Sequence, residues 1–134
     1  ECPLDLFMNL DEQGKAMVAR LSSIGIKLCI DGFGDTPIWL AKLPNLNVEY
    51  IKVAASLTAD FAHQSQVRSL VSGMVDMHSQ NNAKVICEGV ETIEQLKFVK
   101  SLNTYAAQGY YFNYPLSSVG MMSWLKQWRL EHQG

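Results

Sequence analysis

Two patterns alternate along this 134-residue chain, and the alternation restricts the fold more than any other feature. Short runs of apolar and β-branched residues, typical of buried strands, are followed by stretches with apolar residues at helical spacing. We expect strands at 26–30, 50–53, 84–87 and, more weakly, 105–107. We expect helices at 11–24, 38–43, 63–80, after Thr92 and around 121–128. Such alternation is typical of βα units around a parallel sheet, so we predict an α/β fold.

Local signals support several of these boundaries. Gly25 stands where a glycine usually ends a helix, and Thr92 to Gln95 match a capping box. We expect the apolar stripes of the helices to be buried, including the set Met121, Met122, Leu125 and Trp128 of the last one. We expect His63, His78 and His132 at the surface, and Cys29 and Cys87 as buried free thiols in a reducing cytoplasm.

Four βα units can form a small open sheet or half of an eightfold barrel. The first residues of the chain are similar to the end of an earlier strand, so we interpret residues 1–134 as one partial domain. A half barrel exposes strand edges and a one-sided core. We therefore expect the chain to self-associate or to belong to a longer multidomain polypeptide.

The charge balance limits the classes of partner. The formal net charge is -2, and the sequence offers no basic surface for DNA or RNA. A small anionic nucleotide stays possible, because a few local donors or a metal ion can hold it. No run of eighteen apolar residues is present. We expect a cytoplasmic domain, alone or within a longer membrane-anchored protein.

Polar residues follow the expected strands in turn. Asp31, Lys52, Glu88 and Gln108 each come at a strand end, and Glu1 joins them if residue 1 ends an earlier strand. The carboxyl ends of parallel strands meet at one rim, where reactive groups collect. Carboxylates gathered there repel one another unless a divalent cation organises them, and hard oxygen ligands favour magnesium or manganese over zinc. The alternative is that strand ends are half-exposed and simply polar.

Four segments resemble the EAL family, in order and in spacing. They are Asp31-Gly32-Phe33-Gly34, Leu43-Pro44 followed by Ile51-Lys52, Cys87-Glu88-Gly89-Val90-Glu91-Thr92, and Gln108-Gly109-Tyr110 with the later Pro115. The match covers almost the whole chain but only the second half of the family's domain. The third and fourth segments together are the most specific.

The resemblance implies the C-terminal half of a modified TIM barrel that hydrolyses cyclic di-GMP with two divalent metals, magnesium or manganese. It implies metal ligands at Glu1, Asp31 and Glu88, and a catalytic role for Lys52, with Glu88, at the attacking water. Gln108, Tyr110 and Pro115 would lie along the nucleotide. Glu91 would brace the loop after Glu88.

The positions at which the chain departs from the family pattern matter as much as the positions that match it. Gly32 stands in place of the second aspartate, Val53 in place of the acid after the lysine, and Leu4 in place of a supporting glutamate. The family's signature strand and its asparagine ligand lie upstream of this chain. A site that lacks a carboxylate binds its second metal weakly, and water activation suffers first. We therefore expect a degenerate receptor or regulatory module with impaired catalysis.

Three other interpretations stay open. The retained residues are compatible with an active phosphodiesterase within the complete domain. A module that binds a protein partner without nucleotide is a second alternative. An unrelated barrel enzyme, acting on a carboxylate substrate through an enolate, is a third, although such chemistry does not need the last two segments.

Overall fold

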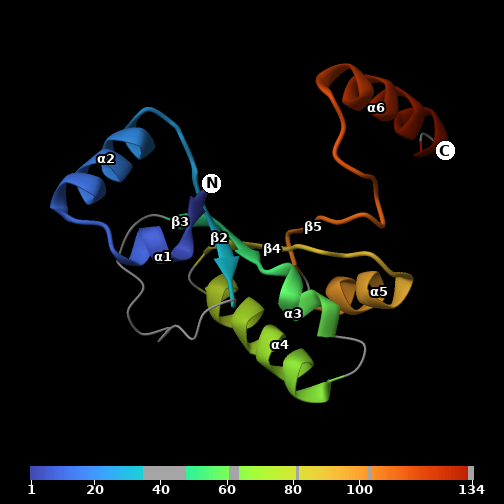
Figure 1. Ribbon diagram of the computed structural model, residues 1–134, viewed down its shortest axis with the longest axis horizontal. Helices are drawn as coiled ribbons and strands as arrows, with labels where there is room; N and C mark the ends of the chain where they lie inside the picture. Colours follow the sequence, from blue (N-terminus) through green and yellow to red (C-terminus); the bar gives the residue numbers. More distant parts are fainter. Residues whose placement is uncertain (35–47, 61–63, 81, 103, 133–134) are drawn as a thin grey trace.

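The centre of the computed structural model is a five-stranded parallel sheet, with strands in the order β1-β2-β3-β4-β5 (Figure 1). The structure describes residues 1–34, 48–60, 64–80, 82–102 and 104–132. Strands in sequence order, joined by helices in the described connections, form the wall of a (β/α) barrel, so the predicted fold class is confirmed. The strands are β1 (Cys2–Pro3), β2 (Leu28–Phe33), β3 (Val48–Val53), β4 (Lys84–Cys87) and β5 (Ala106–Ala107).

Six helices accompany these strands among the described residues. They are α1 (Leu4–Met8), α2 (Glu12–Ser23), α3 (Ala55–Asp60), α4 (Ser65–Gln80), α5 (Ile93–Ser101) and α6 (Ser118–His132). The predicted helix at 38–43 lies outside the described residues. The sequence patterns missed α1 and α3, because helices of five and six residues are too short to show an apolar stripe.

Helix ends follow the predicted signals. The Asp11 carboxylate accepts a hydrogen bond from the backbone N–H of Gly14, and Gly25 follows α2 with a φ of 87°. The Thr92 hydroxyl accepts from the Gln95 N–H at 3.2 Å, and the Gln95 side chain accepts from the Thr92 N–H at 2.9 Å. These reciprocal bonds make the capping box that begins α5, as predicted.

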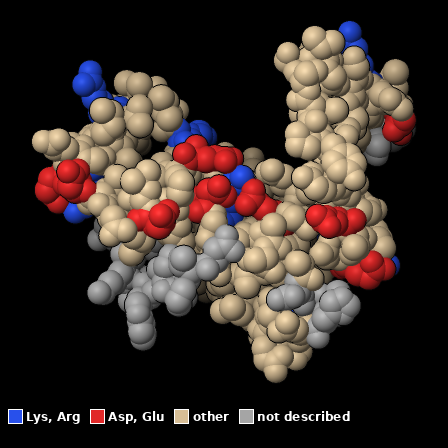
Figure 2. All heavy atoms as spheres, in the orientation of Figure 1, with Lys and Arg blue, Asp and Glu red and all other residues tan. Residues whose placement is uncertain are grey.

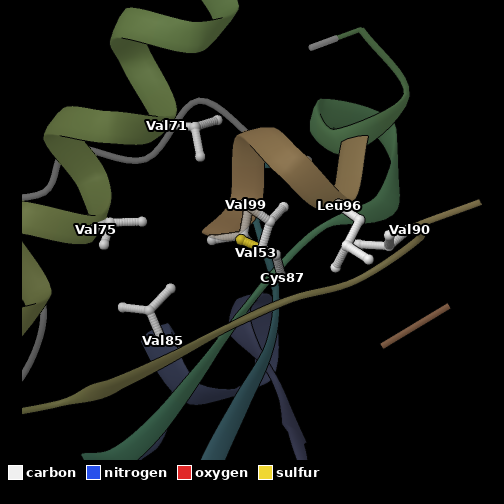
Figure 3. Close-up of a cluster of buried hydrophobic side chains, with 8 residues drawn as sticks. All are labelled: Val53, Val71, Val75, Val85, Cys87, Val90, Leu96 and Val99. Carbon is white, nitrogen blue, oxygen red and sulfur yellow. The ribbon is translucent and has the colours of Figure 1, made fainter. Parts of the chain in front are cut away.

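The main core lies between the sheet and helices α4 and α5 (Figure 3). Val53, Val85 and Cys87 project from the strands, and α4 contributes Val71 and Val75. Val85 and Cys87 are two residues apart and both buried, while Ile86 between them is half-buried, as expected when only every second side chain faces the helices. Burial raises the pKa of the Cys87 thiol to about 12, so this cysteine is an apolar core residue, as predicted.

A second cluster packs α1 against β2 and β3. Leu4 and Phe7 lie on Ile30, Phe33 and Ile51, with Met74 and Ala83 beside them.

The prediction that His78 lies at the surface is wrong. His78 is 2% exposed, and its ring meets Phe33 edge to face at 4.6 Å between centroids. The position continues the buried stripe of α4 formed by Val71, Met74 and Val75. Burial lowers its pKa to about 4, so His78 is neutral at pH 7.

The opposite face of the sheet is less covered. Cys29, Tyr50 and Ile86 alternate with core residues and are only half-buried. Parallel sheets in complete domains are normally covered on both faces. This face therefore has the character of a barrel interior that still lacks part of its cover.

Helix α6 contradicts the expected burial of its apolar residues. It follows an extended segment and lies apart from the sheet (Figure 1), with Met121, Met122, Leu125 and Trp128 all exposed. Helix α2 likewise exposes Met17 and Leu21, and Ile24 just after its end is exposed too. An amphipathic pattern fixes which side of a helix is apolar, but not whether a partner covers that side. Among the described residues, no helix is long and apolar enough to cross a membrane.

Shortening a core valine should cost far more than the same change on α6. Val85 is 2% exposed and Val119 is 76% exposed. Val85→Ala removes buried methyl groups and leaves a cavity, so we expect the free energy of unfolding to fall by about 2 kcal/mol. Val119→Ala should change it by less than about 0.5 kcal/mol. Urea denaturation measures both, and equal losses would contradict the position of α6.

Candidate functional site

The side chain of Lys52, on β3, is the centre of the site. Its ammonium nitrogen lies 2.6 Å from a Glu88 carboxylate oxygen, 3.1 Å from Glu1 and 3.7 Å from Asp31. Lys52 is 5% exposed, whereas the three carboxylates are partly open to solvent. We call Glu1, Asp31, Lys52 and Glu88 the acidic rim. Acidic side chains gather around basic atoms near the middle of the face shown in Figure 2.

The parallel register of the strands brings these residues together. Pro3 is paired with Asp31, and Lys52 with Ile86, so neighbouring strands end at similar heights. The backbone N–H of Glu88 donates to the Val53 carbonyl at 3.0 Å, and that of Gln108 donates to Cys87 at 2.8 Å. Asp31 and Lys52 lie inside strands that extend two and one residues beyond them, a small correction to the predicted strand ends.

Electrostatics keep Lys52 charged. Burial by itself lowers the pKa of the Lys52 ammonium, but hydrogen bonds to Glu88 and Glu1 and the charge of Asp31 outweigh it. The pKa is therefore raised above its ordinary value. A buried ammonium is stable only when it is paired, and here three carboxylates share that role.

Like charges gathered at one rim need a cation to offset their repulsion, and a lysine meets part of that need here. The Lys52 ammonium lies among them and neutralises part of their charge. No group of three or more His, Cys, Asp or Glu side chains in the described part of the chain is arranged to hold a metal ion. The chemistry of the donors still fits magnesium or manganese, because all three are carboxylate oxygens. A metal would have to share them with Lys52.

An open pocket of about 240 Å³ adjoins the acidic rim at Glu88. Its lining includes Glu91, Gln108 and Tyr110, together with Ala55, Gly89 and Gly109. The structure therefore brings Gln108 and Tyr110 to the same mouth as Glu88. Pro115 is exposed on the segment that leads to α6 and does not line this pocket. Ala55 was missed by sequence reasoning, because α3 itself was missed.

Several backbone hydrogen bonds and the Gln95 side chain hold the loop after Glu88. The Glu91 backbone N–H donates to the Gln95 side-chain oxygen at 2.7 Å. The Val90 N–H donates to the Gln108 carbonyl, and the Tyr111 N–H donates to the Val90 carbonyl. Backbone bonds and Gln95 thus shape the loop, and the Glu91 carboxylate is left beside the pocket.

The three departures from the family pattern lie in different environments. Val53 is fully buried in the main core, and Leu4 is 3% exposed in the second cluster. Successive strand residues face opposite sides of a sheet, so the Val53 side chain points away from the rim that holds Lys52. Gly32 is next to Asp31, with a φ of 77°. Val53 and Leu4 thus belong to the core clusters, whereas Gly32 is half-buried beside Asp31 at an irregular point of the β2–β3 pairing.

A larger hollow of about 430 Å³ lies at the other end of the strands, near Lys27 and Glu49. Its charges are already paired, because Glu49 binds Lys27 at 2.7 Å and Lys84 at 3.2 Å. Reactive groups in parallel α/β folds collect at the carboxyl ends of strands, and this hollow is at the amino ends. We therefore assign the candidate site to the acidic rim.

Comparison with known proteins finds relatives of one family by sequence and by structure. The EAL domain profile matches residues 5–115. The cyclic di-GMP phosphodiesterase NbdA of Pseudomonas aeruginosa is 31% identical over 126 residues, which cover 94% of this chain and 16% of NbdA. The chain spans between 14% and 23% of the length of seven further curated relatives.

Two solved structures superpose closely on this chain. The phosphodiesterase PaMucR, described as a cyclic di-GMP complex, has a TM-score of 0.81 and 26% identity over 89% of this chain and 48% of its own. BlrP1 of Klebsiella pneumoniae, described as a complex with manganese and cyclic di-GMP, has a TM-score of 0.78. It is 27% identical and covers 84% of this chain and 29% of its own. These similarities extend to proteins that hold the nucleotide and a metal.

Removing the Lys52 ammonium should destabilise the chain more than removing a surface ammonium. Lys52→Met leaves three carboxylates without their shared cation, and we expect a loss of roughly 1 to 3 kcal/mol in unfolding free energy. Lys27→Met breaks an exposed pair with Glu49 and should cost less than about 1 kcal/mol. Urea titration at pH 7 measures both variants. Similar losses would show that the acidic rim does not depend on Lys52.

Gly109 should not tolerate a side chain. A Cβ atom at Gly109 would overlap the backbone N, C and O atoms of Val90, which cannot move aside as a flexible side chain can. We expect Gly109→Ala to lower the melting temperature by several degrees, since about 1 kcal/mol shifts it by roughly 2 to 8 °C. Gly73→Ala, in α4 with nothing within 4 Å of the new Cβ, should raise it. A neutral Gly109→Ala would refute the close packing of the pocket wall.

Proposed function

Because the chain belongs to the EAL domain family, we propose that it recognises cyclic di-GMP at the acidic rim and the adjoining pocket. The observation that carries this proposal is the convergence of Glu1, Asp31 and Glu88 on Lys52, beside a pocket that Gln108 and Tyr110 line. NbdA and PaMucR, whose names describe cyclic di-GMP phosphodiesterases, support the choice of ligand.

The pocket offers groups for both parts of such a nucleotide. The Gln108 amide can hydrogen-bond to a base edge. Tyr110 and Tyr114 present exposed rings 4.6 Å apart, and exposed aromatic rings are common stacking platforms for bases. The Lys52 ammonium can attract a phosphate. Pro115 follows Tyr114 directly, on the exposed segment that leads to α6.

Glu1, Asp31 and Glu88 would hold a magnesium or manganese ion, which when bound polarises a phosphoryl oxygen and activates water. The manganese complex of BlrP1 supports this cofactor class. Lys52 and Glu88 are the residues we assign to catalysis at this rim. Glu91, beside the pocket, adds a carboxylate that can contact the metal-ligating residues from outside the acidic rim.

We further propose that catalysis is impaired. Gly32 provides no carboxylate next to Asp31, so the oxygen set for a second cation is incomplete. Recognition of the nucleotide depends less on that cation, because it uses Gln108, the tyrosine rings and backbone groups. The chain then acts as a receptor or regulatory module.

An active phosphodiesterase is the second candidate, and one observation favours it. Val53 and Leu4 are core residues in this structure, so two of the three departures do not remove a group from the rim. If the complete domain supplies further ligands, Glu1, Asp31, Lys52 and Glu88 are already in place.

We also propose that residues 1–134 work as a partial EAL domain within a larger assembly. The half-buried sheet face around Tyr50 and Ile86 and the exposed apolar residues of α6 support contacts with a longer chain, a second copy or a protein partner. The three free thiols, Cys2, Cys29 and Cys87, agree with a reducing cytoplasm.

Calorimetric titration with cyclic di-GMP tests recognition directly. We expect saturable heat with manganese present, and at least about tenfold weaker binding for Glu88→Gln, which removes one charge of the rim. Glu94→Gln, on the exposed side of α5, is the matched control and should bind like the wild type. Absence of heat from the wild-type protein in its complete form would leave the protein-binding module as the remaining interpretation.

Turnover separates the receptor from the enzyme. With magnesium or manganese we expect hydrolysis of cyclic di-GMP to be slow or undetectable, and Gly32→Asp to increase it. The φ of 77° at position 32 is unusual for a side chain, but aspartate tolerates this region better than most residues. Rapid turnover by the wild type, unchanged or lowered in Gly32→Asp, would instead establish the active phosphodiesterase.

A further inference from the structure

Gln95 is buried, with 7% of its surface exposed, although its side chain carries an amide that must be hydrogen-bonded. The amide oxygen accepts from the backbone N–H groups of Glu91, at 2.7 Å, and Thr92, at 2.9 Å. The amide nitrogen donates to the backbone carbonyl of Thr58 at 3.3 Å. One side chain thus uses both ends of its amide on two different connections of the sheet.

The two connections lead directly to the acidic rim. Glu91 and Thr92 end the loop that begins with Glu88 after β4. Thr58 belongs to α3, which begins just after β3, the strand that carries Lys52. Glu88 and Lys52 form the shortest ion pair of the rim, at 2.6 Å. Gln95 therefore links the two connections that lie next to Lys52 and Glu88, the partners of that ion pair.

The hydrogen bond from the Gln95 amide meets a physical need at Thr58. The last carbonyls of a six-residue helix have no partners inside the helix, and Thr58 is fully buried, so water cannot serve its carbonyl. The N–H groups of Glu91 and Thr92, the two residues before α5, use the Gln95 amide oxygen as their acceptor. The connections also touch, because a Cβ on Gly89 would lie 2.5 Å from the Cβ of Ala55.

Capping α5 does not explain the choice of glutamine. Glutamate serves equally at this position of a capping box, and its charge suits a helix N-terminus. A glutamate carboxylate could accept from Glu91 and Thr92, but it could not donate to the Thr58 carbonyl. The donor half of the amide is the part that capping leaves unused.

We propose that Gln95 is a positioning residue that fixes the Lys52–Glu88 pair by joining the β3–α3 and β4–α5 connections. Its importance for ligand binding rests on the function proposed above. The Gln95 amide bonds to the backbone of Thr58, Glu91 and Thr92, and it acts on the rim through these three residues.

Three variants separate positioning from capping. Gln95→Glu keeps the acceptor for the helix end and removes the donor to Thr58. Gln95→Met removes the amide without adding charge. Thr92→Ala removes the other half of the capping box, which is the hydroxyl that accepts from the backbone N–H of Gln95. It leaves the hydrogen bond from the Gln95 side chain to Thr58 intact.

The first measurement needs no ligand. In protein labelled with ¹⁵N-lysine, the Lys52 ammonium should give a slowly exchanging signal, identified by its loss in Lys52→Met. We expect Gln95→Glu and Gln95→Met to shift or broaden this signal, and Thr92→Ala to leave it unchanged. An unchanged signal in both Gln95 variants would overturn the proposal.

The second measurement is the affinity for cyclic di-GMP with manganese. We expect both Gln95 variants to bind about tenfold more weakly than Thr92→Ala, the usual effect of losing a residue that orients a ligand. If Gln95→Met binds as tightly as Thr92→Ala, the added charge explains Gln95→Glu and the proposal fails. If the wild type binds no cyclic di-GMP, the proposed function fails, and the Lys52 signal alone decides the role of Gln95.

Discussion

The buried ammonium of Lys52 is the interaction on which the candidate site depends. An unpaired charge at this depth would be costly, so the surrounding structure must supply counter-charges at fixed positions. Glu1, Asp31 and Glu88 do so from neighbouring strand ends, and the resulting ion pairs join those ends at one rim. The three carboxylates are in turn partly neutralised by Lys52. The arrangement offsets part of the repulsion between the carboxylates and leaves them partly accessible to solvent.

One face of the sheet packs against helices, and the other face carries the side chains of the candidate site. Val53 and Lys52 are adjacent in sequence, yet Val53 is in the main core and Lys52 is in the rim. This alternation changes the meaning of departures from the family pattern. Val53 and Leu4 lie in the core clusters, so two of the three altered motif positions concern packing and do not remove a group from the rim. The less covered face and α6 show where the described fold still has apolar surface to bury.

The loop from Glu88 to Thr92 connects the rim with the rest of the barrel wall. It packs against α3 through Gly89 and Ala55, against β5 through Val90 and Gln108, and it is held at its end by Gln95. Gly109 allows Val90 to approach closely, because any side chain there would meet the Val90 backbone. The pocket beside Glu88 is therefore formed by backbone geometry, and its shape depends on residues that carry no reactive group.

The sequence by itself determined the α/β class, most of the strands and the two capping signals of α2 and α5, because hydrophobic period and capping chemistry are local properties. It also determined the candidate rim, since residues at consecutive parallel strand ends must converge. Only the tertiary structure decided that the Lys52 ammonium lies close to all three carboxylates of the rim, because that depends on side-chain positions from separate strands. It also decided that His78 is buried, that α6 is exposed, and that Gln95 reaches Thr58, 37 residues away. A local pattern gives the apolar side of an element, but the partner that meets that side is set by the whole fold.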